Sequence, residues 1–125
     1  YVINASSEPD GTVTNGMSYH ARDGRNANSA MLASVSFDSP QKGLDFQCKL
    51  EQTAFRLGNG KAPASLLKDF LNDDTSKSFG HIKPTFLPGT EFCDFNTLFP
   101  KSVSDMLKTG LIEFGKRIYC ATRTI

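Results

Sequence analysis

Residues 13–30 contain the densest group of side chains that could bind a ligand. The segment VTNGMSYHARDGRNANSA combines three asparagines with two arginines, two glycines and two serines. Asparagine and glycine form tight turns, serine and asparagine offer short-range hydrogen bonds, and arginine presents a cationic fork that fits an acidic group. We therefore predict that this polar loop faces a small-molecule substrate. The candidate site consists of Asn15, Gly16, Ser18, Arg22, Asn26, Asn28 and Ser29.

The same loop also allows a purely structural interpretation. Its asparagines could close turns on their own backbone, and Arg22 could pair with Asp23 or Glu8. A second candidate surface is the phenylalanine series from Phe79 to Phe99, which is either core or an apolar wall for a planar ligand. Residue types alone leave these alternatives open.

Catalytic and metal chemistry receive less support from the residues. His20 fits a solvent-facing strand position better than a proton donor, and His81 has no acidic or histidine neighbour at ligand spacing. The three cysteines form no C-x-x-C pair and are expected to be small hydrophobes in a reducing cytoplasm. The G-x-S-x-G turn of a serine nucleophile is missing from the sequence. We predict no metal site and assign no catalytic residue.

The polar loop must be positioned by the elements on either side of it. Turn residues and hydrophobic spacing predict three strands, at residues 1–5, 12–19 and 30–37. The first two would be joined by the turn Glu8-Pro9-Asp10-Gly11, in which proline presets φ and glycine accepts a positive φ. The loop then lies between the second strand and the third.

Helices are expected in the rest of the chain. The first runs from residue 41 or 43 to Leu57 and ends on Gly58 as a left-handed cap, and a short second helix has Pro63 in its first turn. Residues 77–101 lack periodicity and are expected to be an irregular segment pinned by phenylalanines. The last helix starts with Ser102 and Asp105 as a capping pair. Its predicted buried stripe is Val103, Met106, Leu107, Leu111, Phe114 and Ile118.

Together these elements predict an α+β fold, with a small, mainly antiparallel sheet from the N-terminal third covered by two or three helices. A chain of 125 residues is long enough for one domain, which we expect to span residues 1–125. Its net charge of +1 gives no field that would recruit nucleic acid or an anionic membrane, so neither is expected as a partner. Apolar stretches of only a few residues are too short to span a bilayer.

Several unusual sequence blocks occur in the same order as in a known family. They are Ile3-Asn4-Ala5-Ser6-Ser7-Glu8, Thr14-Asn15-Gly16-Met17-Ser18, Arg22-Asp23-Gly24, Asn26-Ala27-Asn28-Ser29-Ala30, the stretch from Ala54 to Ala64, Asp69-Phe70-Leu71, the stretch from Pro84 to Gly89, and Leu98-Phe99-Pro100. Over residues 1–118 the chain resembles the middle of a bacterial family of uncharacterised FAD-dependent (NAD(FAD)-utilising) dehydrogenases.

This resemblance implies a parent flavoprotein, an oxidoreductase that holds FAD, accepts electrons from NAD(P)H and works in the cytoplasm. The chain would be an internal fragment, the inserted or cap domain on the substrate side, inactive alone and packed on the remaining FAD-binding domain of the same parent chain. Its polar loop would face either the flavin or the substrate. The start Tyr1-Val2-Ile3-Asn4 has neither an initiator methionine nor a signal peptide, which also leads us to expect a fragment. A strand followed by G-x-G-x-x-G and a helix is missing from the sequence, so the phosphate-binding half would lie elsewhere in the parent. The competing hypothesis is a non-catalytic module that binds a small molecule or a partner chain through the polar loop.

Overall fold

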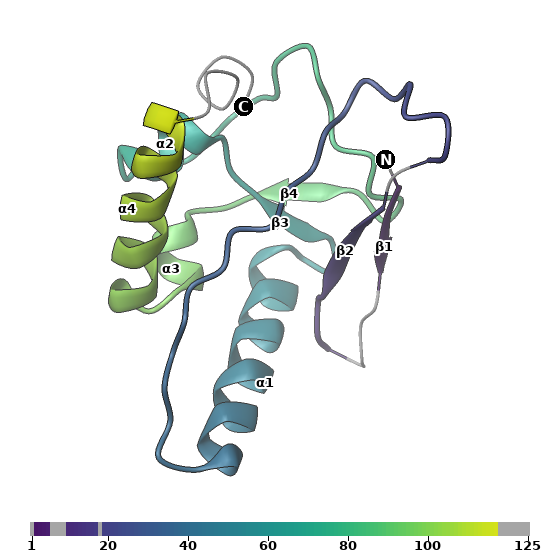
Figure 1. The fold of residues 1–125 in the computed structure, drawn as a ribbon. Helices are drawn as coiled ribbons and strands as arrows, with labels where there is room; N and C mark the ends of the chain where they lie inside the picture. The colour runs from purple at the N-terminus through teal and green to yellow at the C-terminus, as the bar shows by residue number, and fades with distance from the viewer. Residues whose placement is uncertain (1, 6–9, 18, 118–125) are drawn as a thin grey trace.

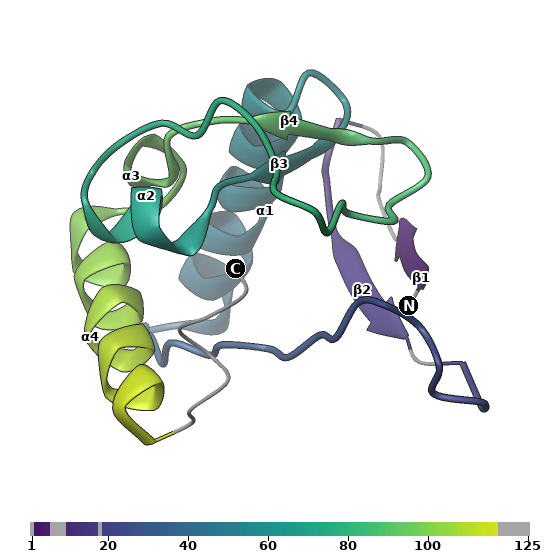
Figure 2. The ribbon, with the colours of Figure 1, turned by 90° about the horizontal axis from the view of Figure 1, so that it is seen from above.

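The computed structural model describes residues 2–5, 10–17 and 19–117 of the chain. In chain order these form β1 (Val2–Ala5), β2 (Thr14–Met17), α1 (Pro40–Leu57), β3 (Ala62–Ala64), α2 (Leu67–Leu71), β4 (Thr90–Phe92), α3 (Phe95–Leu98) and α4 (Lys101–Arg117). Figures 1 and 2 place α2, α3 and α4 on one side of the β3–β4 pair and the β1–β2 pair on the other. Small sheets combined with separate helices confirm the predicted α+β class.

The strands form two separate pairs of opposite type. β1 and β2 are antiparallel, with Val2 opposite Met17 and Ala5 opposite Thr14, as expected for the N-terminal third. Of the predicted turn Glu8-Pro9-Asp10-Gly11, residues 8 and 9 lie outside the described residues. Its left-handed residue is Asp10, with φ 61°, and not Gly11 as predicted. β3 and β4 are parallel, with Ala62 opposite Thr90, and come from the middle of the chain. The expectation of one mainly antiparallel sheet is therefore corrected: the long connection from β3 to β4 returns the chain in the same direction.

The third predicted strand, residues 30–37, does not belong to either sheet. The chain runs from residue 26 to residue 37 without a helix, turn or bend, but it joins no ladder of the described strands. Strand-forming residues produce a sheet only where a second strand offers hydrogen-bonding groups, and no described segment does so here. The prediction of a strand at residues 30–37 is therefore wrong for the described chain.

The start of α1 follows the predicted position, but its end differs. Ser39 caps the helix, since its Oγ accepts a hydrogen bond from the N–H of Lys42 at 3.4 Å. Gly58 has φ −82°, so it is not the left-handed residue; Asn59 and Gly60 are, with φ 50° and 79°. Glycine is still required at position 58, because a Cβ there would clash with the carbonyl oxygen of Lys61. The constraint is close backbone approach and not the sign of φ.

Pro63 lies in β3, not in the first turn of a helix. The ladder bonds on either side of it are donated by the N–H of Ala62 to the Gly89 carbonyl and by the N–H of Cys93 to the Ala64 carbonyl, both at 3.1 Å. Neither bond needs a donor at position 63, so proline fits this short strand. The helix begins only at Leu67.

Buried Ser76 organises the start of α2. Its Oγ accepts a hydrogen bond from the N–H of Leu66 at 2.7 Å and donates one to Oδ2 of Asp69 at 2.8 Å. One hydroxyl therefore satisfies the backbone donor next to the helix and orients a carboxylate of the first turn. This contact joins residues that are ten positions apart, which a local cap pattern cannot reveal.

α4 is present as expected, with a different start and a different buried face. It begins at Lys101, after Pro100, whose carbonyl accepts the N–H groups of Val103 and Ser104. Asp105 pairs with Lys101 at 3.0 Å instead of forming a cap with Ser102. Val103 is buried, but Met106 and Phe114 are 43% and 51% exposed, and Ile118 lies outside the described residues. Leu107 and Leu111 are half-buried, so the predicted stripe is covered only in part, with α3 near the start of the helix and Met31 beside Gly110.

Phenylalanines hold residues 77–101 against the body, although this segment is more regular than predicted because it contains β4 and α3. Ring centroids lie 4.3 Å apart for Phe79 and Phe92, and 5.7 Å apart for Phe70 and Phe95. The buried apolar residues of the described part are Ala62, Phe70, Phe86, Cys93, Leu98 and Val103. The core is small, and it surrounds the β3–β4 pair.

Lys108 joins α4 to the end of α2. Its ammonium pairs with the carboxylate of Asp73 and lies 5.1 Å from the centroid of the Phe70 ring. The Lys108 side chain is only 16% exposed, so its stem is packed while its charge is neutralised. The hydrogen bond from Lys108 lowers the pKa of Asp73 from its ordinary value. Asp73 also has φ 58°, a conformation that aspartate and asparagine tolerate better than most residues.

None of the helices in the described ranges has both the length and the apolar character needed to cross a membrane.

Replacing Gly58 with alanine is expected to lower the free energy of unfolding by about 1–3 kcal/mol, because the new Cβ meets backbone that cannot move without opening the turn. Urea unfolding followed by circular dichroism measures this loss. Gly80→Ala is the matched control, since a Cβ at that position has no neighbour within 4 Å. Equal urea midpoints for Gly58→Ala and Gly80→Ala would show that close backbone packing does not restrict the residue at position 58.

Replacing Asp73 with asparagine keeps the backbone conformation and removes the charge that Lys108 neutralises. Since the folded pKa of Asp73 is lowered, the stabilisation is present above the ordinary pKa of 3.8 and is lost as the pH falls through the folded pKa. We therefore expect a lower melting temperature for Asp73→Asn at pH 7, and a difference from wild type that shrinks below about pH 4. Asp74→Asn is the control, because Asp74 forms no ion pair with any described residue. A pH-independent difference would contradict this account.

Candidate functional site

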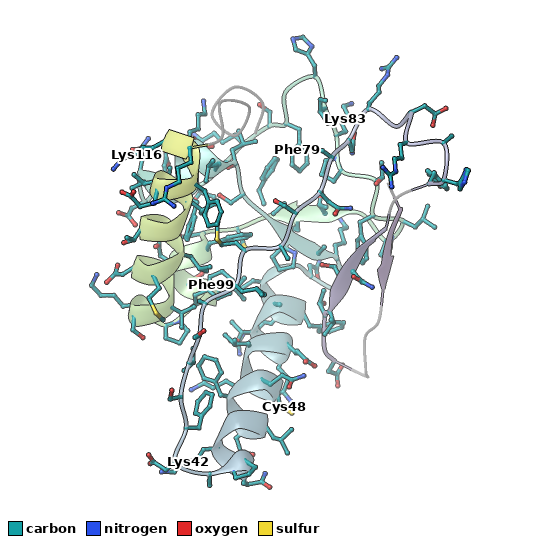
Figure 3. All side chains as sticks on the ribbon, viewed as in Figure 1. Lys42, Cys48, Phe79, Lys83, Phe99 and Lys116 are labelled. Carbon is teal, nitrogen blue, oxygen red and sulfur yellow. The ribbon has the colours of Figure 1, made fainter. Side chains whose placement is uncertain are left out.

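The polar loop lies at the surface, at the end of β2. Arg22 closes a turn, with its N–H donating to the Tyr19 carbonyl at 3.1 Å, and has φ 52°. Asn26 is half-buried and donates from Nδ2 to the Lys83 carbonyl at 2.9 Å. Lys83, labelled in Figure 3, therefore marks the place where the loop meets residues 80–88. The tether at Asn26 fixes the loop to a segment far along the chain.

Gly16 and Asn28 are brought into contact. A Cβ built on Gly16 would lie 2.7 Å from Nδ2 of Asn28, so the asparagine amide occupies the space above this strand position. Asn15 is the neighbouring residue of β2 and is exposed. Glycine at position 16 thus allows the loop to fold back over β2. This contact assigns Asn28 a packing role that the sequence left open.

Arg22 keeps its cationic group available. Within residues 2–5, 10–17 and 19–117, its guanidinium has no ion-pair partner, Asp23 included. Glu8, the other partner considered, lies outside the described residues, as does Ser18 of the candidate site. Ser29 is exposed and makes no side-chain hydrogen bond to another described residue. The structure therefore joins Gly16 to Asn28 and ties down Asn26, while the Arg22 side chain remains exposed.

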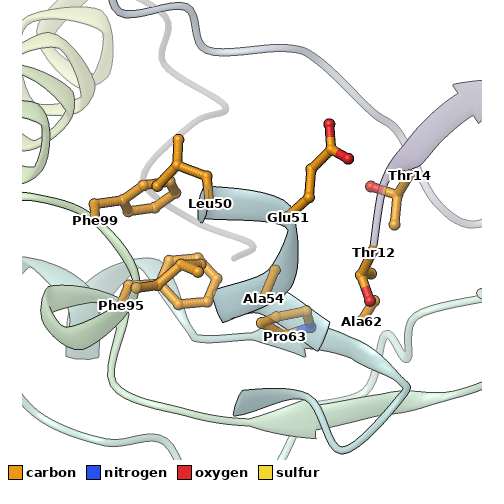
Figure 4. A pocket seen from close by; sticks show the side chains of 10 residues that line it. Thr12, Thr14, Leu50, Glu51, Ala54, Ala62, Pro63, Phe95 and Phe99 are labelled. Atoms are coloured by element: carbon orange, nitrogen blue, oxygen red, sulfur yellow. The ribbon is translucent and has the colours of Figure 1, made fainter. Parts of the chain in front are cut away.

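A separate apolar groove lies between α1, α3, β3 and the start of β2, and has a volume of ≈ 250 Å³. Figure 4 shows its lining side chains: Thr12, Thr14, Leu50, Glu51, Ala54, Ala62, Pro63, Phe95, Leu98 and Phe99. The N–H of Thr12 donates to the Glu51 carbonyl at 3.2 Å and closes one side. The rings of Phe95 and Phe99 meet edge to face, with centroids 5.8 Å apart. The arrangement is an apolar wall with one carboxylate at its rim.

Sequence reasoning identified only part of this groove. Phe95 and Phe99 belong to the series for which an apolar wall was one of two interpretations. Leu50 and Ala54 were predicted to lie in the first helix, Thr12 to begin a strand, and Pro63 to lie in the first turn of a helix. No local signal could find the groove, because its walls come from four elements that only the fold brings together.

The remaining candidates give no reactive site. Burial raises the pKa of the Cys93 thiol, and the negative charge of Asp94 adds to this, so a thiolate is disfavoured there. Cys48 is exposed and unpaired, and Cys120 lies outside the described residues. Among the described side chains, histidines, cysteines and carboxylates do not gather in groups of three or more that could hold a metal ion.

Almost the whole sequence is similar to known proteins. Residues 1–124 match the sequence profile of the family "FAD-dependent protein, C-terminal domain-like". An uncharacterized protein of Clostridium beijerinckii is 44% identical over 124 residues, which cover 94% of this chain. The chain spans 23% of the length of that relative.

FAD can be tested against the groups that the structure presents. A pyrophosphate needs several backbone N–H groups or cations in one cradle, as at a glycine-rich turn before a helix. α1 instead starts at Ser39 and Pro40, and the groove has Glu51 as its charged lining residue. Its ≈ 250 Å³ is also below the range of about 300–1,000 Å³ that is typical of ligand pockets. The described residues therefore do not fit a complete FAD.

The isolated chain is consequently expected to bind FAD with a dissociation constant weaker than about 1 µM, since tighter binding would need more than about 8 kcal/mol. Titration followed by flavin fluorescence measures this, with circular dichroism confirming that the helices are formed. The full-length parent protein serves as the positive control. Submicromolar binding by the isolated chain would show that it contains a phosphate cradle after all.

Proposed function

Because this chain belongs to the family of FAD-dependent proteins with a C-terminal domain of this type, we propose that it forms the substrate-side cap domain of a larger FAD-dependent oxidoreductase of the dehydrogenase class. The remaining FAD-binding domain of the parent would hold the cofactor, which supplies the hydride chemistry, with NAD(P)H as electron donor. Residues 1–125 would act as one domain that positions a small-molecule substrate and excludes water. The parent is proposed to work in the cytoplasm, without nucleic acid or membrane as partner.

The observation that carries this proposal is the amount of surface left uncovered. The chain exposes 9241 Å², whereas a folded monomer of 13.7 kDa is expected to expose about 6600 Å². Large apolar side chains account for part of the excess, with Leu32 and Leu87 almost fully exposed. A chain with so much apolar surface is better explained as one layer of a larger protein than as an independent module.

Two surfaces could contact a substrate held against the flavin. The polar loop offers Arg22, whose guanidinium could form a bidentate pair with a carboxylate or phosphate. The groove offers the apolar wall of Phe95 and Phe99, which suits the flat part of a small molecule. Of the two, we assign substrate recognition to the loop around Arg22, because a cation without a partner among the described residues is a specific recognition element.

A non-catalytic binding module remains the second candidate. It is favoured by the groove itself, where Glu51 is the one ionisable lining residue. A strand followed by G-x-G-x-x-G and a helix elsewhere in the parent sequence would support the flavoprotein. Absence of such a motif, together with a purified parent that carries no flavin, would favour the binding module.

Replacing Arg22 with alanine in the full-length parent is expected to reduce kcat/KM for an acidic substrate by the equivalent of about 1.5–3 kcal/mol, the range for a lost charge-assisted hydrogen bond. The measurement is the rate of NAD(P)H oxidation by the flavin-loaded parent, followed by absorbance, with a panel of small organic carboxylic acids and phosphate esters offered as electron acceptors. Stability should change little, because the side chain is exposed and has no ion pair with a described residue.

Arg25→Ala is the matched control, since Arg25 is an exposed arginine of the same loop outside the candidate site. Asn28→Ala separates packing from recognition: loss of stability with normal activity per folded molecule indicates packing against Gly16. Equal effects of Arg22→Ala and Arg25→Ala would mean that only the overall charge of the loop matters, and would overturn the assignment of Arg22.

A further inference from the structure

Residues 30–37 have the sequence of a strand but pair with no described strand. The segment, AMLASVSF, combines apolar and β-branched residues with the alternation typical of strands. It contains no turn or bend. Within the described part of the chain, none of its backbone N–H or carbonyl groups makes a hydrogen bond to another residue. The backbone N–H and carbonyl groups on both edges of the segment therefore have no hydrogen-bond partner among the described residues.

Both ends of this segment are fixed on the body. Near its start, a Cβ built on Gly110 of α4 would lie 3.5 Å from the sulfur of Met31, so Met31 packs on that helix. At its end, the Phe37 ring lies 5.2 Å from the ring of Phe46 on α1 and also borders Gly43. Figure 1 shows the segment running down between α4 and α1 to the start of α1. The strand is therefore held in place before any partner arrives.

The two faces of the segment differ in burial. Met31 and Ala33 are half-buried, whereas Leu32 between them is 88% exposed. Alternate side chains of an extended segment point to opposite faces, so Val35 and Phe37, each 40% exposed, share the face of Met31 and Ala33 that lies toward the domain. Leu32 shares the opposite, exposed face with Ser34 and Ser36.

We propose that residues 30–37 pair with a β-strand from the remaining part of the same parent protein, which completes a sheet across the boundary between the two parts. Strand addition to a free edge joins two bodies through main-chain hydrogen bonds, and the exposed side chain of Leu32 would be covered on the same occasion. The parent is favoured as the source because this chain spans only 23% of the C. beijerinckii relative and leaves far more surface uncovered than a domain of its size. The inference rests on the proposed function only in that the chain is part of a larger protein.

Amide hydrogen exchange in the full-length parent tests the pairing at single-residue resolution. Successive N–H groups of a strand point to opposite edges. Pairing on one edge should therefore slow exchange by about 100-fold or more at every second residue of 30–37, with fast exchange at the residues between. Exchange at the unprotected rate throughout the segment would overturn the proposal. Protection that appears only at high protein concentration, with a dimer in size-exclusion chromatography, would also overturn it in favour of a second copy.

Two proline variants give an independent check. Ser34→Pro and Val35→Pro each remove one donor, but on opposite edges of the strand. One variant should lower the melting temperature of the full-length protein clearly more than the other. The more damaging proline should be the one that replaces the residue whose amide is protected from exchange. Equal effects would contradict pairing on one edge. Flavin content is measured on the same samples: a parent with bound FAD but an unprotected segment refutes only the strand pairing, and a protected segment in a flavin-free parent refutes only the proposed function.

Discussion

The parallel β3–β4 pair is the contact on which the other elements depend. It joins residues 62–64 to residues 90–92 through ladder bonds at Ala62 and Cys93, and the ion pair of Lys61 and Glu91, at 3.0 Å, crosses the same two strands. Two strands of three residues are marginal by themselves. The turn at Gly58 therefore matters, because it connects α1 to β3 and its backbone is too closely packed for a side chain at position 58. α2 leaves from β3, and α3 and α4 follow β4, so the groove and the aromatic contacts depend on the register of this pair.

The distinction between local and non-local constraints explains which elements the sequence predicts. α1 and α4 were found because apolar spacing is a property of the helix alone, and the end of α1 at Leu57 was correct. Pro63 was misplaced because the reason for its position is the β4 strand, which lies about 28 residues further along the chain. Gly58 was given the wrong reason, since its neighbour is a carbonyl oxygen rather than an unfavourable φ. Each error occurs where a distant segment determines the local structure.

The features of the candidate site also separate into those that local sequence predicts and those that distant contacts determine. Composition identified the polar loop, because asparagine and glycine indicate turns, and asparagine and arginine supply hydrogen-bond donors, within a few residues of sequence. It could not show that Asn26 would be tied to the Lys83 carbonyl or that Asn28 would rest on Gly16. Arg22 and Arg25 both remain exposed cations without an ion pair to a described residue. The groove could be anticipated only through its phenylalanines, since Thr12, Glu51 and Pro63 become neighbours only in the folded chain.

The unpaired segment and the uncovered helix face have one physical explanation. Ordering one backbone residue costs about 1–2 kcal/mol, whereas an aromatic pair such as Phe37 and Phe46 adds about 0.5–1.5 kcal/mol beyond its burial. That contact offsets the ordering of about one residue, and residues 30–37 gain no backbone hydrogen bonds from the described chain. On α4, the exposed side chains of Met106 and Phe114 likewise gain little stabilisation from burial. A sequence selected for strand residues and for an apolar helix stripe at these positions implies that both are covered in the protein where they work. The strand pairing that we propose with another part of the parent would supply this missing stabilisation.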